Sequence, residues 1–195
     1  MDLTEPIRCE RLTLRLLRDD DVDALWPHVS DPELPRYMTW EHHQDRAETA
    51  RFVAAMVKAA KDGAGYVWTM REGEDFRGLV GLHDVRRQQL AWRIDRAELG
   101  YWIGAPWRNR GLTTEGARAA LRFGFERLGL HKITVGCVKD NEASVRVIEH
   151  LGFRFLGVQR EHFHRFGRWW DHLSYELLVD EWCAAAAADR QAPAR

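Results

Sequence analysis

The segment WRNRGLTT, residues 107–114, gathers anion-binding groups where a strand ends and a helix begins. The first N–H groups of a helix have no acceptor inside it and lie at the positive end of the helix dipole. Gly111 lets a ligand come close to the backbone. Positive charge and hydroxyl donors come from Arg108, Arg110, Thr113 and Thr114. The segment therefore predicts a phosphate site, with a solvated helix start capped by Thr113 as the alternative.

Two other phosphate-binding patterns are absent from the sequence: there is no GxxxxGK[ST] P-loop, and no GxGxxG follows a strand. The chain has 29 Lys and Arg residues against 30 Asp and Glu residues, so its formal net charge is −1. Such a balance gives no overall attraction to nucleic acid or to a membrane surface. Anion binding is therefore expected to be local, and we predict no nucleic-acid or membrane partner.

The number and spacing of the cysteines indicate the cellular compartment of the protein. Cys9, Cys137 and Cys183 are far apart and form no CxxC pair, which argues against a disulfide framework or a zinc knuckle. No apolar run resembles a signal peptide or is long enough to span a bilayer. The sequence thus predicts a cytoplasmic protein, and 195 residues with 45% apolar content predict one globular domain with a full core.

Hydrophobic periodicity predicts the elements around the anion-binding segment. Strands are expected over 11–17, 65–71, 78–85, 90–104, 131–138, 154–164 and 169–178, and helices around 22–29, 44–61, 117–128 and 141–151. On the strand 90–104, Glu98, Gly100 and Trp102 share one face. The succession of strand, helix and strand from 90 to 138 predicts a right-handed crossover with two parallel strands in one sheet.

Four segments resemble motifs of the GNAT N-acyltransferases. RNRGLT is similar to their acyl-CoA pyrophosphate loop, R/Q-x-x-G-x-G/A, except that Thr113 stands where the loop has Gly or Ala. NEASVRVIEHLGF, residues 141–153, is similar to their second motif, N-x-x-S-x-x-x-x-x-x-LGF. With AELGYWIG before the loop and WWDHLSYELLVDEW near the end, the chain most resembles the RimJ/RimL group, which acetylates N-terminal α-amines of ribosomal proteins.

The resemblance implies an α+β fold, the GNAT fold, over residues 8–182, and we expect the tail, 183–195, to be disordered. It implies a mostly antiparallel, seven-stranded sheet with about four flanking helices and one parallel βαβ pair that splays for acyl-CoA. A splayed pair leaves backbone groups unpaired, and the amide-rich arm of CoA satisfies them as an added strand does. The implied co-substrate is acetyl-CoA, with no metal.

The resemblance also implies which residues contact CoA. These are Trp102, Ile103, Arg108, Asn109, Arg110, Gly111, Leu112, Thr113, Thr114, Asn141 and Ser144. The backbone N–H of Ile103 is implied as the oxyanion donor, and Ser144 as the general acid for the leaving sulfur. Ser144 as a packing residue and Asn141 as a helix N-cap are the alternatives, and Asp140 in the cap position would free Asn141.

Transfer of an acyl group from a thioester to an amine needs a neutral amine, a stabilised tetrahedral oxyanion and a leaving thiolate. It needs no covalent enzyme intermediate. An α-amine titrates near pH ~8 and a lysine near ~10.4, so a modest base suffices for an α-amine. Glu98 is our candidate base because the neighbouring Gly100 leaves room for a substrate. The alternative is a solvated or ion-paired strand carboxylate.

The acceptor side is predicted in the aromatic segment EHFHRFGRWWDH, residues 161–172, and in nearby tryptophans. Our candidate substrate-binding residues are Trp92, His164, Trp170 and Asp171, while Trp40 and Trp68 belong either to the groove or to the core. Ordinary hairpin stabilisation by cross-strand aromatics is the alternative. We reject a metal site at His162, His164 and His172, because no helical HxxxH and no Cys partner accompanies them.

Taken together, the sequence predicts an acetyl-CoA-dependent N-acetyltransferase that acts on a primary amine. That amine is either the N-terminal α-amine of a protein, including a ribosomal protein, or a small molecule. The alternatives are a non-catalytic acyl-CoA sensor on the same fold, and transfer from a longer donor such as succinyl-CoA. A homodimer through the last hairpin is a further expectation.

Overall fold

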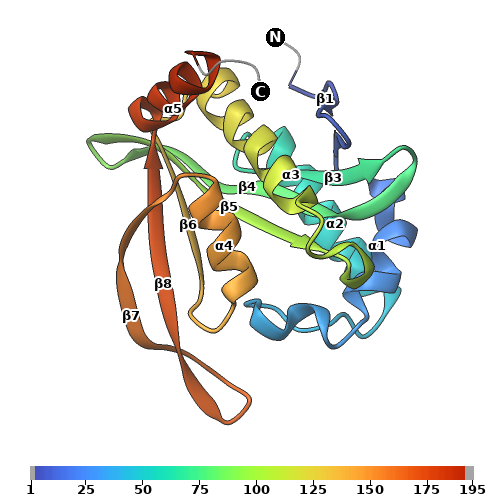
Figure 1. Cartoon of the computed structure of the whole chain (residues 1–195). Coiled ribbons are helices and arrows are strands. Elements are labelled where there is room, and N and C mark those ends of the chain that lie inside the picture. Colours follow the sequence, from blue (N-terminus) through green and yellow to red (C-terminus); the bar gives the residue numbers. More distant parts are fainter. Residues whose placement is uncertain (1–2, 192–195) are drawn as a thin grey trace.

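The computed structural model describes residues 3–191, which form one sheet of eight strands in the order β1-β2-β3-β4-β5-β6-β8-β7 (Figure 1). The strands are β1 (Ile7–Arg8), β2 (Thr13–Leu16), β3 (Tyr66–Glu72), β4 (Asp75–Gln89), β5 (Trp92–Ile103), β6 (Lys132–Val138), β7 (Arg154–Arg165) and β8 (Arg168–Leu178). The α-helices are α1 (Val22–Val29), α2 (Arg46–Lys61), α3 (Leu112–Arg122), α4 (Glu142–His150) and α5 (Val179–Gln191). Shorter helical turns are η1 (Asp19–Asp21), η2 (Leu34–Tyr37), η3 (Ala105–Trp107) and the π-helical η4 (Phe123–Arg127).

One strand pair, β5 and β6, is parallel, and all the others are antiparallel. The parallel register comprises Arg96 with Lys132, Ala97 with Ile133, and Glu98 with Thr134. Pairing ends there, although β5 continues to Ile103 and β6 continues to Val138. The predicted parallel pair and its splay are therefore confirmed, and the strands part directly after Glu98.

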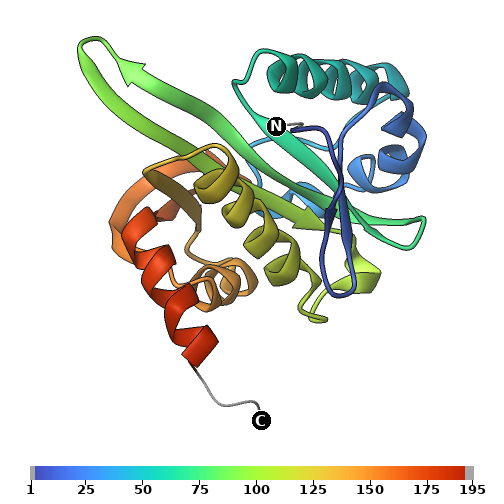
Figure 2. The ribbon, with the colours of Figure 1, turned by 90° about the horizontal axis from the view of Figure 1, so that it is seen from above.

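The two faces of the sheet carry separate hydrophobic clusters. Helices α3, α4 and α5 cover one face, while α1 and α2 cover the other (Figure 2). Because side chains alternate along a strand, β5 contributes Ala97 and Leu99 to the first cluster and Trp102 to the second. The two faces of β5 therefore meet different helices.

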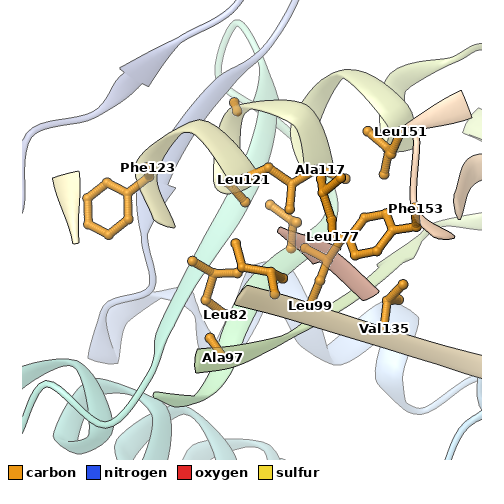
Figure 3. Packing of buried hydrophobic residues seen from close by; sticks show 14 of the residues in the cluster. Leu82, Ala97, Leu99, Ala117, Leu121, Phe123, Val135, Leu151, Phe153 and Leu177 are labelled. Carbon is orange, nitrogen blue, oxygen red and sulfur yellow. The ribbon is translucent and has the colours of Figure 1, made fainter. Parts of the chain in front are cut away.

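Helix α3 packs closely on the sheet because most of its buried residues are glycine or alanine. A Cβ atom added at Gly116 would lie 2.6 Å from Met70 Sδ, so only glycine fits at this contact. Leu121 is fully buried, and Figure 3 shows it beside Ala117 in the first cluster. Truncation of such a leucine to alanine typically costs about 2–5 kcal/mol. This packing holds the N-terminus of α3 at the end of β5.

The structure differs from the sequence expectation near both ends of the chain. Over the described residues, the sheet has an eighth strand, the two-residue β1, and α5 is a fifth α-helix. Helix α5 continues to Gln191, whereas we expected disorder from residue 183. Its start is fixed because Trp182 is buried against Phe125, with ring centroids 5.7 Å apart, and the alanine run that follows has high helix propensity. The rest of the expected tail, 192–195, lies outside the described residues.

No helix in the described part of the chain is long and apolar enough to cross a membrane.

Candidate functional site

The loop between β5 and α3 presents a bare helix start. Asn109 has φ 61° and Gly111 has φ 75°, so the chain turns twice through the left-handed region before α3 begins. Glycine adopts this conformation without strain, which explains Gly111 at the N-cap position. It has no capping side chain, so the first N–H groups of α3 face outward at the positive end of the helix dipole.

The carboxylate of Glu115, in the first turn of α3, does not compete with a bound anion for the free N–H groups, because it is hydrogen-bonded to the β1–β2 turn. Its Oε1 accepts from the backbone N–H groups of Arg11 and Leu12, at 2.8 and 3.0 Å, and its Oε2 pairs with Arg11 Nε at 2.8 Å. Arg11 Nη1 also donates to the carbonyl of Arg110 at 2.8 Å. Arg11 thus fixes the loop from the opposite side, a contact that sequence spacing alone did not reveal.

A groove of about 1010 Å³ opens beside this helix start. Its floor includes the predicted loop residues Arg108, Asn109, Arg110, Gly111, Leu112, Thr113 and Thr114, and it reaches Ile103 at the end of β5. Further arginines line it from three elements, namely Arg8, Arg11, Arg118, Arg122 and Arg146. Leu112 is buried, so its side chain belongs to the core and only its backbone is available to a ligand. The groove therefore joins a strongly basic surface to the open end of the gap between β5 and β6.

Backbone groups of β5 face the gap between β5 and β6. The Gly104 N–H donates to Arg77 O at 2.9 Å, on the β4 side, whereas Ala97 O accepts from Thr134 Oγ1 at 3.4 Å, on the β6 side. Successive residues of a strand direct their backbone groups to opposite sides. The N–H groups of Tyr101 and Ile103 therefore point into the gap, where β6 no longer pairs with them.

Trp102 does not join this arrangement. Its side chain is buried in the α1–α2 cluster, where its ring lies 6.1 Å from His28 and 5.7 Å from Phe76. Its backbone is paired with Leu79 of β4. The prediction that Trp102 contacts the cofactor is therefore corrected: alternation along β5 turns it to the opposite face.

Ser144 lies in the first turn of α4 and faces Tyr101 of β5, with 2.9 Å between the two hydroxyl oxygens. Burial raises the pKa of Tyr101, so this phenol stays protonated. Asn141 caps α4, because its Oδ1 accepts from the Ser144 N–H at 3.2 Å. Asp140 is instead paired with Arg168 at 2.8 Å, so it does not free Asn141. Tyr101 was not among the sequence candidates, because its position on a core-facing strand resembled that of a packing residue.

Glu98 lies at the last parallel pair before β5 and β6 separate. Its side chain is on the α1–α2 face and is partly in contact with solvent. Burial among its neighbours, and the negative charge of Asp84, raise the pKa of its carboxyl group. Across the β4–β5 ladder its direct partner is His83. A carboxylate that binds protons more readily than usual thus stands where the gap begins, at the last paired residues of β5 and β6.

The four predicted acceptor residues are not all together. Trp92 is 77% exposed at the tip of the β4–β5 hairpin, roughly 35 Å from Ile103 along a strand that rises about 3.3 Å per residue. This position removes Trp92 from the candidate site. Trp68 is fully buried and belongs to the core. Trp40 packs at the edge of the α1–α2 cluster.

The other three acceptor candidates lie on the β7–β8 hairpin. Trp170 is buried and its ring is 6.0 Å from Tyr37 of η2. His164 is exposed and packs beside Trp169, with ring centroids 5.1 Å apart. Asp171 accepts from the Glu161 N–H at 3.0 Å. The contacts of His164 and Asp171 lie within the hairpin, as in the alternative expected from the sequence, whereas the ring contact of Trp170 is with η2.

A tie between the hairpin tip and η2 was not predicted. Arg165 Nη1 donates to the carbonyls of Pro35, Met38 and Trp40 at 2.8, 2.7 and 3.1 Å. The hairpin and the segment after α1 are thereby joined along the same side of the molecule as Glu98. In the described residues, no group of three or more His, Cys, Asp and Glu side chains is arranged to hold a metal ion.

Comparisons with known proteins agree with this geometry. Residues 11–154 match the model of the acetyltransferase (GNAT) domain. The [ribosomal protein uS5]-alanine N-acetyltransferase of Escherichia coli K12 is 31% identical over 179 residues, which cover 89% of this chain and 90% of that protein. The structure of RimL, a ribosomal L7/L12 α-N-protein acetyltransferase in complex with CoA, has a TM-score of 0.83 at 19% identity and covers 91% of this chain and 99% of that one. Spermidine N-acetyltransferase from Vibrio cholerae, with CoA and spermine, has a TM-score of 0.78 at 23% identity and covers 89% of this chain and 98% of that one.

Proposed function

Because the chain belongs to the acetyltransferase (GNAT) domain family and is an acetyl-CoA-dependent N-acetyltransferase, we propose that its acceptor is the N-terminal α-amine of a ribosomal protein. The relative from Escherichia coli carries that activity in its name. The acid–base chemistry of the site supports the same class. An α-amine titrates near pH ~8, against ~10.4 for an alkyl amine, so a weak base such as Glu98 suffices. The observation that carries the proposal is the position of Glu98, next to the gap that the basic groove reaches.

The positive charge of the groove suits the phosphates of CoA. We assign the pyrophosphate to the N–H groups at the start of α3, with Arg108 and Arg110 as charge partners, since helix starts bind phosphates through backbone donors. Thr113 and Thr114 line the same groove and offer hydroxyl donors. Arg118, Arg122 and Arg146 supply positive charge for the nucleotide end. Asn141 has its amide nitrogen left for the pantetheine arm, because its oxygen caps α4.

Acetyl-CoA supplies the acetyl group as a thioester. On the protein, the Ile103 N–H points into the gap and stabilises negative charge on the acyl oxygen, as oxyanion-hole donors do. Glu98 lies five residues before Ile103 on β5, so it takes the proton that the attacking amine releases through intervening water. Ser144 donates to the departing sulfur, and Tyr101, which keeps its proton, holds the Ser144 hydroxyl in place. No covalent attachment of the acetyl group to the protein is needed.

The acceptor is tested by CoA thiol release from acetyl-CoA. The amines compared are a peptide with the N-terminus of a ribosomal protein that begins with alanine, the same peptide N-blocked with one free lysine, and spermidine. The proposal expects the first peptide to have the largest kcat/KM. Faster turnover of spermidine would assign the acceptor site to polyamines, and faster turnover of the lysine peptide would assign it to side-chain amines.

We further propose that the protein acts as a homodimer in the cytoplasm, where its cysteines, free in the described residues, stay reduced. Strand β7 lies at the edge of the sheet and exposes Phe155, Leu156 and Val158, at 51%, 52% and 45%. An exposed apolar edge strand pairs readily with a second chain. Sedimentation velocity on the wild type and on Leu156→Lys tests this: we expect a dimer that the lysine dissociates, and a monomeric wild type would contradict it.

A further inference from the structure

We propose that His83 is a second acid–base residue of the acetyl transfer, which receives from Glu98 the proton that the acceptor amine releases. The inference rests on the proposed role of Glu98 and extends it. His83 lies on β4, is half-buried, and did not figure among the sequence candidates. Its position relative to Glu98 and to the gap carries the argument.

His83 and Glu98 are direct partners in the antiparallel β4–β5 ladder. Partners of this kind have their Cβ atoms about 4.5–5.5 Å apart and project from the same face of the sheet. That face is the one opposite the buried Ala97 and Leu99, and it is the face on which we place the acceptor amine. A carboxylate and an imidazole at this spacing exchange a proton directly or through one water.

Two glycines direct the His83 ring toward the reacting end of β5. A Cβ atom added at Gly100 would lie 3.1 Å from the His83 Cδ2 and Nε2 atoms, and one added at Gly81 would lie 3.0 Å from Nε2. The ring therefore lies over the Gly81–Gly100 pair, one register step from Glu98 in the direction of Ile103. A side chain at either glycine would displace the His83 ring. The imidazole therefore lies over β4 and β5 on the Ile103 side of Glu98, and not toward the tip of the β4–β5 hairpin.

The surroundings bring the proton affinities of the two groups together. Burial lowers the pKa of His83, so the imidazole is neutral and ready to accept a proton. Burial and Asp84 raise the pKa of Glu98. The charged groups beside the pair are Asp84 and Arg86 of β4 and Arg96 of β5, and Asp84 pairs with Arg86 at 2.6 Å and with Arg96 at 3.6 Å. A Cβ atom added at Gly65, before β3, would lie 3.7 Å from the His83 Cα, so the residue packed there brings no charge.

The proton follows a balanced path. The amine nitrogen forms its bond to the acyl carbon as the carbonyl π electrons move to the oxygen, and its N–H bond breaks as the proton passes through water to a Glu98 oxygen. When the carbonyl re-forms, the carbon–sulfur bond breaks and CoA leaves as the thiolate, which takes a proton from Ser144 that water restores. The Glu98 O–H bond then breaks, the proton bonds to a His83 nitrogen, and Glu98 returns to the carboxylate. The imidazolium releases its proton to water. No oxidant, reductant or further co-reactant is required.

Another histidine on this face does not meet the same conditions. His172 of β8 pairs with Val138, and its ring lies over Gly136 of β6. Strand β6 therefore stands between His172 and Glu98. Its Nδ1 has no hydrogen-bond partner among the described residues. The direct ladder contact distinguishes His83 as the partner of Glu98.

The first test needs no substrate. The imidazole of His83 is titrated by NMR in the wild type and in Glu98→Gln. Because the carboxylate stabilises the imidazolium, its removal should lower the His83 midpoint, whereas the midpoint of His43, a buried histidine bonded to Thr49 at 2.9 Å, should not move. An unchanged His83 midpoint would show that the two groups are not coupled and would overturn the proposal.

The second test is kinetic and uses whichever amine the wild type acetylates fastest. His83→Gln should lower kcat by about 10- to 100-fold, within the range for one acid–base group, with an unchanged KM for acetyl-CoA. It should also remove one limb of the pH profile. In His83→Ala, added imidazole should restore turnover in proportion to its neutral fraction. His43→Gln is the matched control for the loss of a buried imidazole, and it should keep the wild-type pH profile.

The outcomes separate this inference from the acceptor assignment. If the wild type prefers another amine but His83→Gln behaves as described, only the ribosomal acceptor is wrong. If the ribosomal peptide is acetylated but His83→Gln keeps the wild-type rate and pH profile, the inference about His83 fails. A loss of rate that imidazole does not restore, with an unchanged pH profile, would assign His83 to packing and contradict the proposal.

Discussion

The two sides of β5 are built in different ways. On the α3–α4 side, most of the groove that we propose for CoA is lined by one contiguous stretch, the loop and helix from Trp107 to Arg122, with the remainder from residues 8–11, Ile103 and α4. On the α1–α2 side, the face that we propose for the acceptor carries residues from distant parts of the chain: His83, Glu98 and the Arg165 tie to η2. We therefore expect donor recognition to depend on local backbone geometry, and acceptor recognition to depend on the pairing of strands and on loop contacts.

The largest effect is expected on the acceptor side, from Glu98→Gln. It should lower kcat about 10²–10³-fold with little change in the KM for acetyl-CoA, since general bases contribute about 10²–10⁴-fold. Glu98 acts only when ionised and its pKa is raised, so wild-type activity should fall as pH drops through that raised value. In the variant the amine must lose its proton to water, so the pH optimum should move up toward the amine pKa.

Steady-state rates over a pH series check this prediction. An unaltered profile would mean that another group or water is the base. If Glu98→Gln also weakened acetyl-CoA binding, the two sides of β5 would not act separately on the donor and the acceptor.

Gly111→Val should give the largest effect on the donor side. Gly111 has φ 75°, and a Cβ atom there would lie 3.4 Å from Arg11 Nη2, so a β-branched residue strains the loop and crowds its partner. Such backbone strain costs about 1–3 kcal/mol. With the phosphate approach also blocked, calorimetry should find acetyl-CoA bound about 100-fold more weakly, where each 1.4 kcal/mol is tenfold.

Gly129→Val is the matched control for Gly111→Val. Gly129 has φ 63° at the other end of the α3–η4 segment, where nothing lies within 4 Å of an added Cβ atom. It should share the loss of stability but retain CoA affinity. Equal affinity of Gly111→Val and the wild type would remove the pyrophosphate from this helix start.

Arg165→Met tests the acceptor side at a distance from the chemistry. Loss of the bonds to the Pro35, Met38 and Trp40 carbonyls releases the hairpin from η2. We expect the KM for the peptide to rise about tenfold, since a buried hydrogen bond to a charged group contributes about 1.5–3 kcal/mol. The KM for acetyl-CoA should stay the same. Arg160→Met, at an exposed position on β7, is the control, and similar kinetics for both variants would contradict a role for the tie.

Ser144→Ala should have the smallest effect. The CoA thiolate is a stable leaving group, so loss of the hydroxyl donor should lower kcat by only about three- to tenfold, below the usual range for an acid–base group. Tyr101→Phe keeps the ring but removes the partner hydroxyl and should lower kcat less than Ser144→Ala does. Pre-steady-state measurement of thiol release distinguishes them. A rate equal to the wild type in both variants would leave Ser144 as a packing residue.

Most element positions were predictable because their signals are local. The alternation along 90–104 gave the faces of β5, and the glycines at 111 and 129 marked the bounds of the α3 region. The small strand β1 carries only two residues, too few for a periodic pattern. Helix α5 is longer than expected because Trp182 packs on Phe125, and the sequence did not predict this contact between residues that are 57 positions apart.

The predictions for the site also succeeded where the signal is local and failed where it depends on long-range contacts. The residues of the phosphate loop were predicted from seven contiguous letters and were found together in one groove, apart from the side chain of Leu112. Trp92 and Trp102 were misassigned because residue type carries no information on hairpin length or on which cluster a strand face meets. Arg11, Tyr101, His83 and Arg165 were missed because each depends on a partner more than ten residues away in the chain.

The sequence by itself determined the crossover unit, the bare helix start and the chemistry available to a base on β5, since these follow from neighbouring residues and strand or helix periodicity. The tertiary structure alone decided that β5 and β6 part after Glu98, that His83 lies across from it, and that Arg165 joins the last hairpin to η2. The physical reason is that register and long-range contacts depend on how whole elements pack, and no local pattern of side chains specifies that packing.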